Sequence, residues 1–457
     1  MAAPIENSVE HTTSRPTRRF QLKCLLAAVA ILHLSITFSV FIIGKYQLVP
    51  SQFYPSGIGG FASDGLLYER QIPELSELLR TQGVRAWATS PMQLHVRLYS
   101  LPFAVFSRWA SFNVLTIEPV NLFYYLAILI FTFKIGARVF DYHTGLIAAT
   151  IVALWPSLLL HTTQVLRDPL LILAFLVAIW CLIKLIERDF GWRGLPLIAL
   201  AGVASLLTIR IVRLPMWYVM LLGIAGAVLF FVLRSIQQRQ FRMAAAVFAL
   251  LMIAAVGLIP PFQPYFHNQQ VLGIPRVIDP EEEDKRPLVE QMYRRREAFE
   301  YQRDLQGVQS VAEDGSRIDS DMRLNTAGGV IRHLPRAFEI GFFAPFPNMW
   351  LGRGKQVGAS GRLFSGFETL LTYVIESMAL IGLWWQRRNL AAWLLLIVAA
   401  AGAISLGLVV NNIGAMYRLR YPFWVLLVVL GAAGARFLFR RFTAVSVDYG
   451  ASREVPL

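Results

Sequence analysis

Long apolar stretches divide the chain into segments that are long enough to cross a lipid bilayer. A spanning helix needs about 20 mostly apolar residues. Ten stretches approach or exceed this length: 22–44, 117–135, 144–162, 168–187, 194–211, 214–234, 243–262, 365–385, 389–410 and 419–438. Trp155 and Pro156 interrupt the third stretch and predict a kink there. The pattern therefore predicts an all-α polytopic membrane protein with about ten transmembrane helices.

Two longer and more polar segments separate these helices. The first, 45–116, follows the opening helix, and the second, 263–364, lies between the seventh and eighth helices. Residues 98–112 are apolar, but an arginine and a proline interrupt them, so we expect an interfacial helix rather than a further span. Residues 334–350 are amphipathic and rich in aromatic residues and prolines. They predict a second interfacial helix, after which the chain turns.

These features predict a chain in five parts. They are a disordered cytoplasmic N-terminus (1–20), a seven-helix membrane module that includes the first long segment (21–262), a large exoplasmic loop (263–364), a three-helix membrane part (365–440) and a cytoplasmic tail (441–457). The opening helix is too long for a signal-peptide core and lacks a cleavage site of small residues. It is therefore expected to be a retained signal anchor.

Basic residues set the expected orientation, because cytoplasmic loops are enriched in Lys and Arg. With a cytoplasmic N-terminus, most Lys and Arg of the short loops lie on that face. Five arginines lie on the other face: Arg167, Arg210, Arg213, Arg418 and Arg420. Both termini are thus predicted to be cytoplasmic and both long segments exoplasmic. The small loops favour a bacterial inner membrane with its site on the periplasmic side, and an endomembrane is the alternative.

The composition excludes several classes of protein. Charged residues make up 16% of the 457 residues and hydrophobic residues 56%, whereas soluble proteins average about 25% charged residues. An ordinary soluble enzyme, a disordered chain and a fibrous repeat are therefore excluded. Basic cytoplasmic loops explain the net charge of +14, so no nucleic-acid partner is expected. Cys24 and Cys181 lie in apolar stretches and indicate no disulfide framework.

The five outer arginines oppose the orientation bias and therefore require an explanation. Each lies at the outer end of a helix, from which its side chain could simply reach the lipid headgroups. Their convergence from three loops suggests an anion site instead, because a guanidinium fork matches phosphate oxygens. We expect at least two of them to bind a lipid-linked phosphate.

Two carboxylates are expected on the same face as these arginines. Asp64 lies in FASDGLLYER (61–70), one helical turn before Tyr68, and Asp168 follows Arg167 at the outer mouth of the fourth helix. Either aspartate could be a helix cap, and the proline after Asp168 suits an N-cap there. Alternatively, a carboxylate beside cations stays ionised and can act as a base toward a hydroxyl.

Three stretches resemble the GT-C integral-membrane glycosyltransferases, such as the protein O-mannosyltransferases and the aminoarabinose-to-lipid A transferases. FASDGLLYER resembles the Asp-x-x-x-Tyr stretch of their first outer loop. Residues 133–172 resemble their pattern across spans two to four, and MYRLRYPFWVLLVVLGA (416–432) resembles the Arg-x-Arg-x-Pro opening of a late span. The order of spans and long loops matches over most of the chain.

The resemblance implies an enzyme that moves a sugar from a polyprenyl-phosphate donor to a hydroxyl of a lipid or glycan acceptor. Transfer would occur at the exoplasmic face, with inversion at the anomeric carbon. Asp64 takes the place of the catalytic residue of the first loop, as general base, and Asp168 that of the second carboxylate. The groups near the donor phosphate are Arg167, Arg210, Arg418 and Arg420, and the candidate substrate contacts are Tyr68 and His161.

The sequence indicates no certain cofactor. No pair among the seven histidines has zinc spacing. Gly65 follows Asp64, so the second acidic residue of the O-mannosyltransferase pattern is missing. A divalent metal therefore remains an option that the spacing does not support, and no metal ligand is assigned.

Three alternatives stay open. An O-antigen-type polymerase or ligase also uses outer-loop arginines, with a diphosphate-linked lipid as donor. A transporter or lipid flippase predicts ionisable groups near the midplane and paired broken helices, whereas the charges here lie at helix ends. An inactive assembly protein with the same fold is the third alternative.

Overall fold

The computed structural model describes residues 15–62, 64–258, 287, 289–292, 294, 296, 318, 319, 322, 324, 326–351 and 358–451, and these residues form a helical bundle without a β-strand. The helices of the first part are α1 (Arg15–Lys45), α2 (Asp64–Thr89), α3 (Leu94–Phe106), α4 (Glu118–Val139), α5 (Tyr142–Ala153), α6 (Pro156–Thr162), α7 (Asp168–Glu187), α8 (Leu195–Val212), α9 (Leu214–Gln237) and α10 (Met243–Leu258). The later helices are α14 (Ala327–Phe343), α15 (Gly358–Trp385), α16 (Leu390–Val409), α17 (Ile413–Leu419) and α18 (Tyr421–Ala451). Short 3₁₀ helices are η1 (Gly60–Ala62), η2 (Val114–Ile117) and η4 (Pro347–Met349).

Eight helices in the described part of the chain are long and apolar enough to cross a membrane, and the pair α5–α6 would make a ninth. This pair is bent by 68° at the break before Pro156, which confirms the predicted kink. The apolar helix α10 has 16 residues and is shorter than a full span. The predicted stretch 243–262 continues into residues outside the described range. The prediction of a multi-pass helical membrane protein is confirmed, with eight or nine spans by length.

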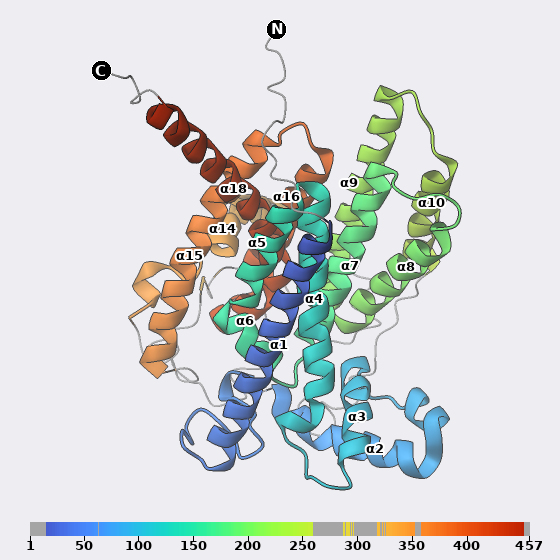
Figure 1. Cartoon of the computed structure of the whole chain (residues 1–457). Coiled ribbons are helices and arrows are strands. Elements are labelled where there is room, and N and C mark those ends of the chain that lie inside the picture. Colours follow the sequence, from blue (N-terminus) through green and yellow to red (C-terminus); the bar gives the residue numbers. More distant parts are fainter. Residues whose placement is uncertain are drawn as a thin grey trace.

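The two ends of the bundle differ (Figure 1). Helices α2 and α3 gather at one end, which we call the outer end, whereas α1 begins and α18 finishes at the opposite, inner end.

Two helices extend beyond the predicted boundaries. α1 begins at Arg15, inside the segment 1–20 that was expected to be disordered, and α18 continues to Ala451 through the predicted tail. A proline at position 16 suits a first helical turn, and the residues after 440 contain no helix breaker before Gly450. The cytoplasmic location of the inner end stays a prediction.

The two expected interfacial helices take different forms. The first, α3, is a 13-residue apolar helix that is shorter than a full span, and its interfacial position stays a prediction. The second, α14, packs along α16 through small residues. A Cβ added to Gly407 would lie 2.0 Å from the carbonyl oxygen of Ala337, and one added to Gly341 would lie 2.2 Å from that of Ala403. Such close packing is typical of helices in membranes, so the amphipathic pattern of α14 reflects in part a face that contacts α16.

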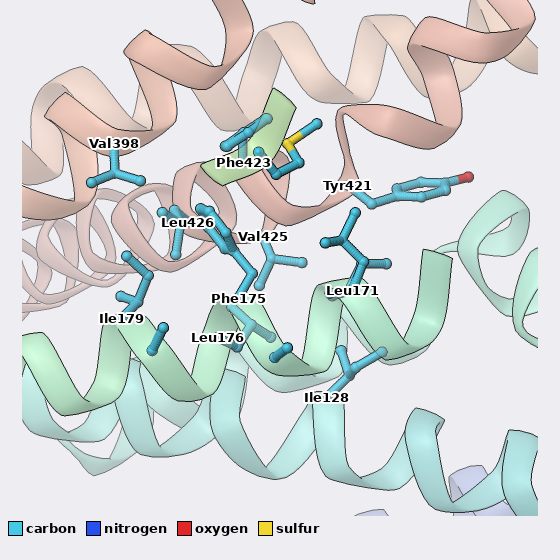
Figure 2. Packing of buried hydrophobic residues seen from close by; sticks show 14 of the residues in the cluster. Ile128, Leu171, Phe175, Leu176, Ile179, Val398, Tyr421, Phe423, Val425 and Leu426 are labelled. Atoms are coloured by element: carbon cyan, nitrogen blue, oxygen red, sulfur yellow. The ribbon is translucent and has the colours of Figure 1, made fainter. Parts of the chain in front are cut away.

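A core of large apolar side chains joins α4, α7, α16 and α18 (Figure 2). The ring of Phe175 in α7 packs edge-on against Phe423 in α18, with the ring centroids 5.2 Å apart. A Cβ added to Gly402 of α16 would lie 2.2 Å from the Phe423 ring, so only glycine leaves room for this ring. The core therefore fixes α7 beside α18. It also brings together the outer ends of these helices, where Asp168 and the α17–α18 connection lie.

Candidate active site

Two aspartates from distant parts of the chain share one arginine. Nη2 of Arg418 in α17 lies 3.0 Å from Oδ2 of Asp64, and its Nε lies 3.7 Å from Oδ2 of Asp168. The side chains of Arg418 and Asp168 are 14% and 7% exposed, whereas that of Asp64 is 40% exposed. One guanidinium therefore connects the first residue of α2, the first residue of α7 and the segment that leads into α18.

The loop before α2 is held against the connection between α6 and α7. The buried side chain of Gln164 accepts a hydrogen bond from the backbone N of Gly59 at 2.8 Å, and its Nε2 donates to the carbonyl of Gly57 at 3.5 Å. Gly57 has φ of +86°, a conformation that favours glycine. These contacts fix the start of α2, and with it Asp64, next to the start of α7 and Asp168.

Asp168 is not the N-cap of α7, which corrects one of the two interpretations drawn from the sequence. The helix begins at Asp168 itself, its N-cap residue is Arg167, and no side-chain cap hydrogen bond is present. Oδ1 of Asp168 is buried and has no hydrogen-bond partner. A capping role therefore does not account for this carboxylate, and its buried oxygen Oδ1 is left unsatisfied.

Positive charge exceeds negative charge around the two aspartates. The charges of Arg167 and Arg213 act on both of them in addition to that of Arg418. Burial raises the pKa of Asp64, but Arg418 and Arg167 together lower it more, so the pKa lies below its ordinary value. Nε of Arg167 is buried without a hydrogen-bond partner. Three guanidinium groups thus surround two carboxylates, an arrangement that favours binding of an anion.

Arg213 and Arg210 differ in their contacts, and the predicted role of Arg210 as a phosphate ligand stays a prediction. Arg210, one of the four predicted phosphate ligands, is buried with its guanidinium 5.5 Å from the centre of the Trp217 ring. Arg213, which was counted among the outer arginines but not chosen as a ligand, acts on the aspartates. It lies at the break between α8 and α9. This break, marked by the proline at 215, is the signal that would have favoured Arg213.

Arg420 is directed away from its neighbour Arg418. Its buried Nη1 donates hydrogen bonds to the carbonyl oxygens of Phe342 and Ala344, at 3.1 and 2.9 Å. These carbonyls lie at the C-terminal end of α14, where a cation satisfies otherwise unpaired acceptors. Arg420 therefore caps the C-terminal end of α14. Its role as a phosphate ligand stays a prediction.

Tyr68 and His95 form an aromatic pair beside the charged groups. Their rings are T-shaped with centroids 4.6 Å apart, and the residues are 4% and 2% exposed. Burial raises the pKa of Tyr68 to about 12 and lowers the pKa of His95 to about 3, so both are neutral at pH 7. Nε2 of His95 is buried without a hydrogen-bond partner. No motif in the sequence marks His95, since only the packing of α2 on α3 brings it to the site.

His161 presents a fixed tautomer at the edge of the site. Its Nδ1 lies 2.5 Å from the carbonyl oxygen of Ser157 and 3.3 Å from the hydroxyl of Tyr421. Because a carbonyl only accepts hydrogen bonds, Nδ1 carries the proton in the neutral ring, and Nε2 is left as an acceptor. Its place agrees with the predicted substrate contact, which stays a prediction.

A buried glutamate that the sequence did not single out supports this edge of the site. Glu368 of α15 is 1% exposed and accepts a hydrogen bond from the backbone N of Ser157 at 2.8 Å. Its other carboxylate oxygen accepts from the hydroxyl of Tyr417 in α17. Glu368 therefore ties the start of α6 to the short helix that carries Arg418. It lies near the start of the predicted stretch 365–385, where no nearby motif indicates a partner.

The described residues do not fit a divalent metal at the two aspartates. No group of three or more His, Cys, Asp or Glu in the described part of the chain is placed to hold a metal ion. Arg418 hydrogen-bonds to Oδ2 of Asp64 and forms an ion pair with Oδ2 of Asp168. A bridging divalent cation would compete with this guanidinium for the same oxygens and would be repelled by it.

No family model matches the chain, and no curated protein matches it in sequence. Among solved structures, the chain is similar to the archaeal oligosaccharyltransferase AglB from Archaeoglobus fulgidus, in complex with an inhibitory peptide and a dolichol-phosphate, with a TM-score of 0.50 and 13% identity. The match covers 97% of this chain and 53% of that chain, so this chain spans about half the length of the archaeal protein. At this identity the likeness shows the fold alone. The chain shares the fold of this neighbour, as the resemblance of its sequence to the GT-C glycosyltransferases implied.

Proposed function

We propose that this protein is a membrane glycosyltransferase that takes a sugar from a polyprenyl-phosphate carrier and transfers it to a hydroxyl of a lipid or glycan at the outer end of the bundle. The observation that carries the proposal is the excess of guanidinium groups around two aspartates that share Arg418. The fold supports it, as does the dolichol-phosphate in the complex of the archaeal neighbour.

The proposed reaction is a single displacement at the anomeric carbon. The acceptor oxygen forms a bond to this carbon while the bond to the phosphate oxygen breaks, and the electron pair leaves on the phosphate. The acceptor proton passes to Asp64. Arg167, Arg213 and Arg418 stabilise the negative charge that develops on the phosphate. Attack from the side opposite the phosphate inverts the anomeric centre. Asp168 holds Arg418 in place, and the neutral Tyr68 and His161 contact the sugar or the acceptor.

The shared arginine couples donor binding to activation of the base. Without donor, Arg418 holds the pKa of Asp64 below its usual value, which keeps the carboxylate ionised but makes it a weak base. A bound phosphate competes with the carboxylates for the guanidinium. When Arg418 turns toward the phosphate, Asp64 loses its closest cation and its pKa rises. Asp64 thus becomes a stronger base only when a donor is present.

The substitution Asp64→Asn tests the proposal. It keeps the shape of the side chain but removes the base, so we expect transfer from a radiolabelled polyprenyl-phosphate sugar to fall by about a thousandfold. The abundance and unfolding temperature of the protein should stay unchanged. Glu77→Gln on the same helix, whose side chain is 61% exposed, is the matched control and should retain full activity. Normal turnover by Asp64→Asn would exclude the assignment, and a preference for a diphosphate carrier would favour a polymerase or ligase.

A further inference from the structure

Three arginines converge at the inner end of the bundle. Arg188 follows the last residue of α7, Arg234 lies in the last turn of α9, and Arg242 directly precedes α10. Arg188 has φ of +56°, in the left-handed region that residues other than glycine rarely adopt. Burial and repulsion from Arg234 and Arg242 lower the pKa of Arg188. Arg234 and Arg242 therefore lie close enough for their charges to act on Arg188.

The described contacts of these arginines are all with neutral groups. Arg188 is 4% exposed, and its Nη1 donates to the carbonyl of Gln240 at 2.7 Å, while its Nη2 donates to the side-chain oxygen of Gln238. Arg242 donates to the carbonyl of Arg188 at 2.8 Å. The Nε atoms of Arg188 and Arg234 are buried and have no hydrogen-bond partner. Two charge-bearing N–H groups are thus left without an acceptor.

Other cations at the same end are paired with acids. Arg138 bonds to Glu187 and, at 2.7 Å, to Asp189, and Arg436 bonds to Asp141. Among the residues that the structure describes, none of the three converging arginines has a carboxylate oxygen within 4.0 Å. The preference of cytoplasmic loops for basic residues explains why arginines occur here. It does not explain why three of them converge without an acid, since like charges in a partly buried place are costly.

We propose that this inner arginine cluster binds a phosphate-type anion, either the headgroup phosphate of an anionic lipid or free phosphate. The two unsatisfied Nε–H groups supply donors, and guanidinium forks match the geometry of phosphate oxygens. Ile236, Phe241 and Met243 next to the cluster are 68%, 63% and 59% exposed, so apolar surface that suits a lipid tail borders the charges. The site lies at the end of the bundle opposite Asp64 and does not depend on the proposed transferase activity.

Thermal unfolding of the full chain in a neutral detergent, at constant ionic strength, tests this site. The probes are dioctanoyl-phosphatidylglycerol, inorganic phosphate and dioctanoylglycerol, which lacks a phosphate. We expect at least one phosphate-bearing probe to raise the unfolding temperature, because a ligand that binds only the folded state stabilises it. Arg234→Gln should weaken the apparent Kd of that probe about tenfold. Its folding should be unaffected, since the Arg234 side chain makes no described hydrogen bond to lose.

Arg193→Gln is the matched control, because it removes one positive charge from an exposed residue of the α7–α8 connection at the same end. It should leave the apparent Kd unchanged. A response to phosphatidylglycerol alone identifies a lipid headgroup, and a response to inorganic phosphate identifies a site for the free anion. The proposal is overturned if neither phosphate-bearing probe stabilises the protein, if dioctanoylglycerol stabilises it equally, or if Arg234→Gln binds like the unsubstituted chain.

Discussion

Two polar clusters of the molecule differ in how completely their buried atoms are paired. In the cluster between α1, α4 and α6, His33 bonds to Glu118 at 2.7 Å and to the Thr162 hydroxyl at 3.1 Å, and Thr37 donates to the second carboxylate oxygen at 3.0 Å. Both nitrogens of His33 and both side-chain oxygens of Glu118 therefore have partners. Such a saturated cluster holds helices together and has little capacity left to bind a ligand.

The cluster at Asp64 and Asp168 is unsaturated. Oδ1 of Asp168, Nε of Arg167 and Nε2 of His95 are all buried without a partner. An unsatisfied buried polar atom costs about 1–3 kcal/mol, so three of them in one place need a compensating benefit. The comparison teaches that buried unpaired atoms, together with the excess of positive charge, distinguish the candidate site from a saturated structural cluster.

The largest effect is expected in the saturated cluster. Glu118→Ala leaves His33 and Thr37 without their shared acceptor, and each buried group left unsatisfied costs about 1–3 kcal/mol. We expect a marked fall in the unfolding temperature and abundance of the purified protein, while the transfer activity per folded molecule stays within about twofold. A variant as stable as the unsubstituted protein, or one that is stable but inactive, would contradict the assignment of this cluster to structure.

The next effect concerns the arginine of the unsaturated cluster. Arg418→Gln removes one donor to the developing phosphate charge, so transfer should fall by about a hundredfold. It also removes the main cation that lowers the pKa of Asp64, and burial then raises this pKa. The acid limb of the pH profile of kcat/KM, which reports the protein without donor, should therefore move to higher pH than in the unsubstituted protein. An unchanged acid limb would show that Asp64 is not the titrating base.

The smallest effect is expected at His95. Replacing a buried ring that has an unpartnered nitrogen by phenylalanine removes a polar atom without opening a cavity, so His95→Phe should change the free energy of unfolding by less than about 1 kcal/mol. If Nε2 accepts a hydrogen bond from substrate, the same variant should lose activity mainly through a raised KM. Steady-state kinetics and thermal unfolding of one preparation separate the two effects. A strongly destabilised variant would place His95 among the structural residues.

The sequence predicts the fold well where hydropathy and proline decide it. The spans and the break before Pro156 follow from the length of apolar runs and from one residue type. The distribution of basic residues placed Asp64 and Asp168 on one face of the membrane, and the resemblance to a family gave them roles in one site. Which helix faces pack together decides that Arg213, His95 and Glu368 lie at or beside the candidate site. These contacts cannot be predicted from one sequence alone. The same holds for α14, because its amphipathic pattern fits both a helix at the membrane interface and a helix that packs on a neighbour.

The most direct test is a structure of the full chain in lipid nanodiscs with a bound polyprenyl-phosphate sugar, determined by electron cryomicroscopy. We expect the phosphate within about 3 Å of the guanidinium groups of Arg167, Arg213 or Arg418, and the anomeric carbon on the side of Asp64. A carrier phosphate that binds instead at the inner arginine cluster, or at the lipid boundary away from both aspartates, would contradict the proposed site of transfer.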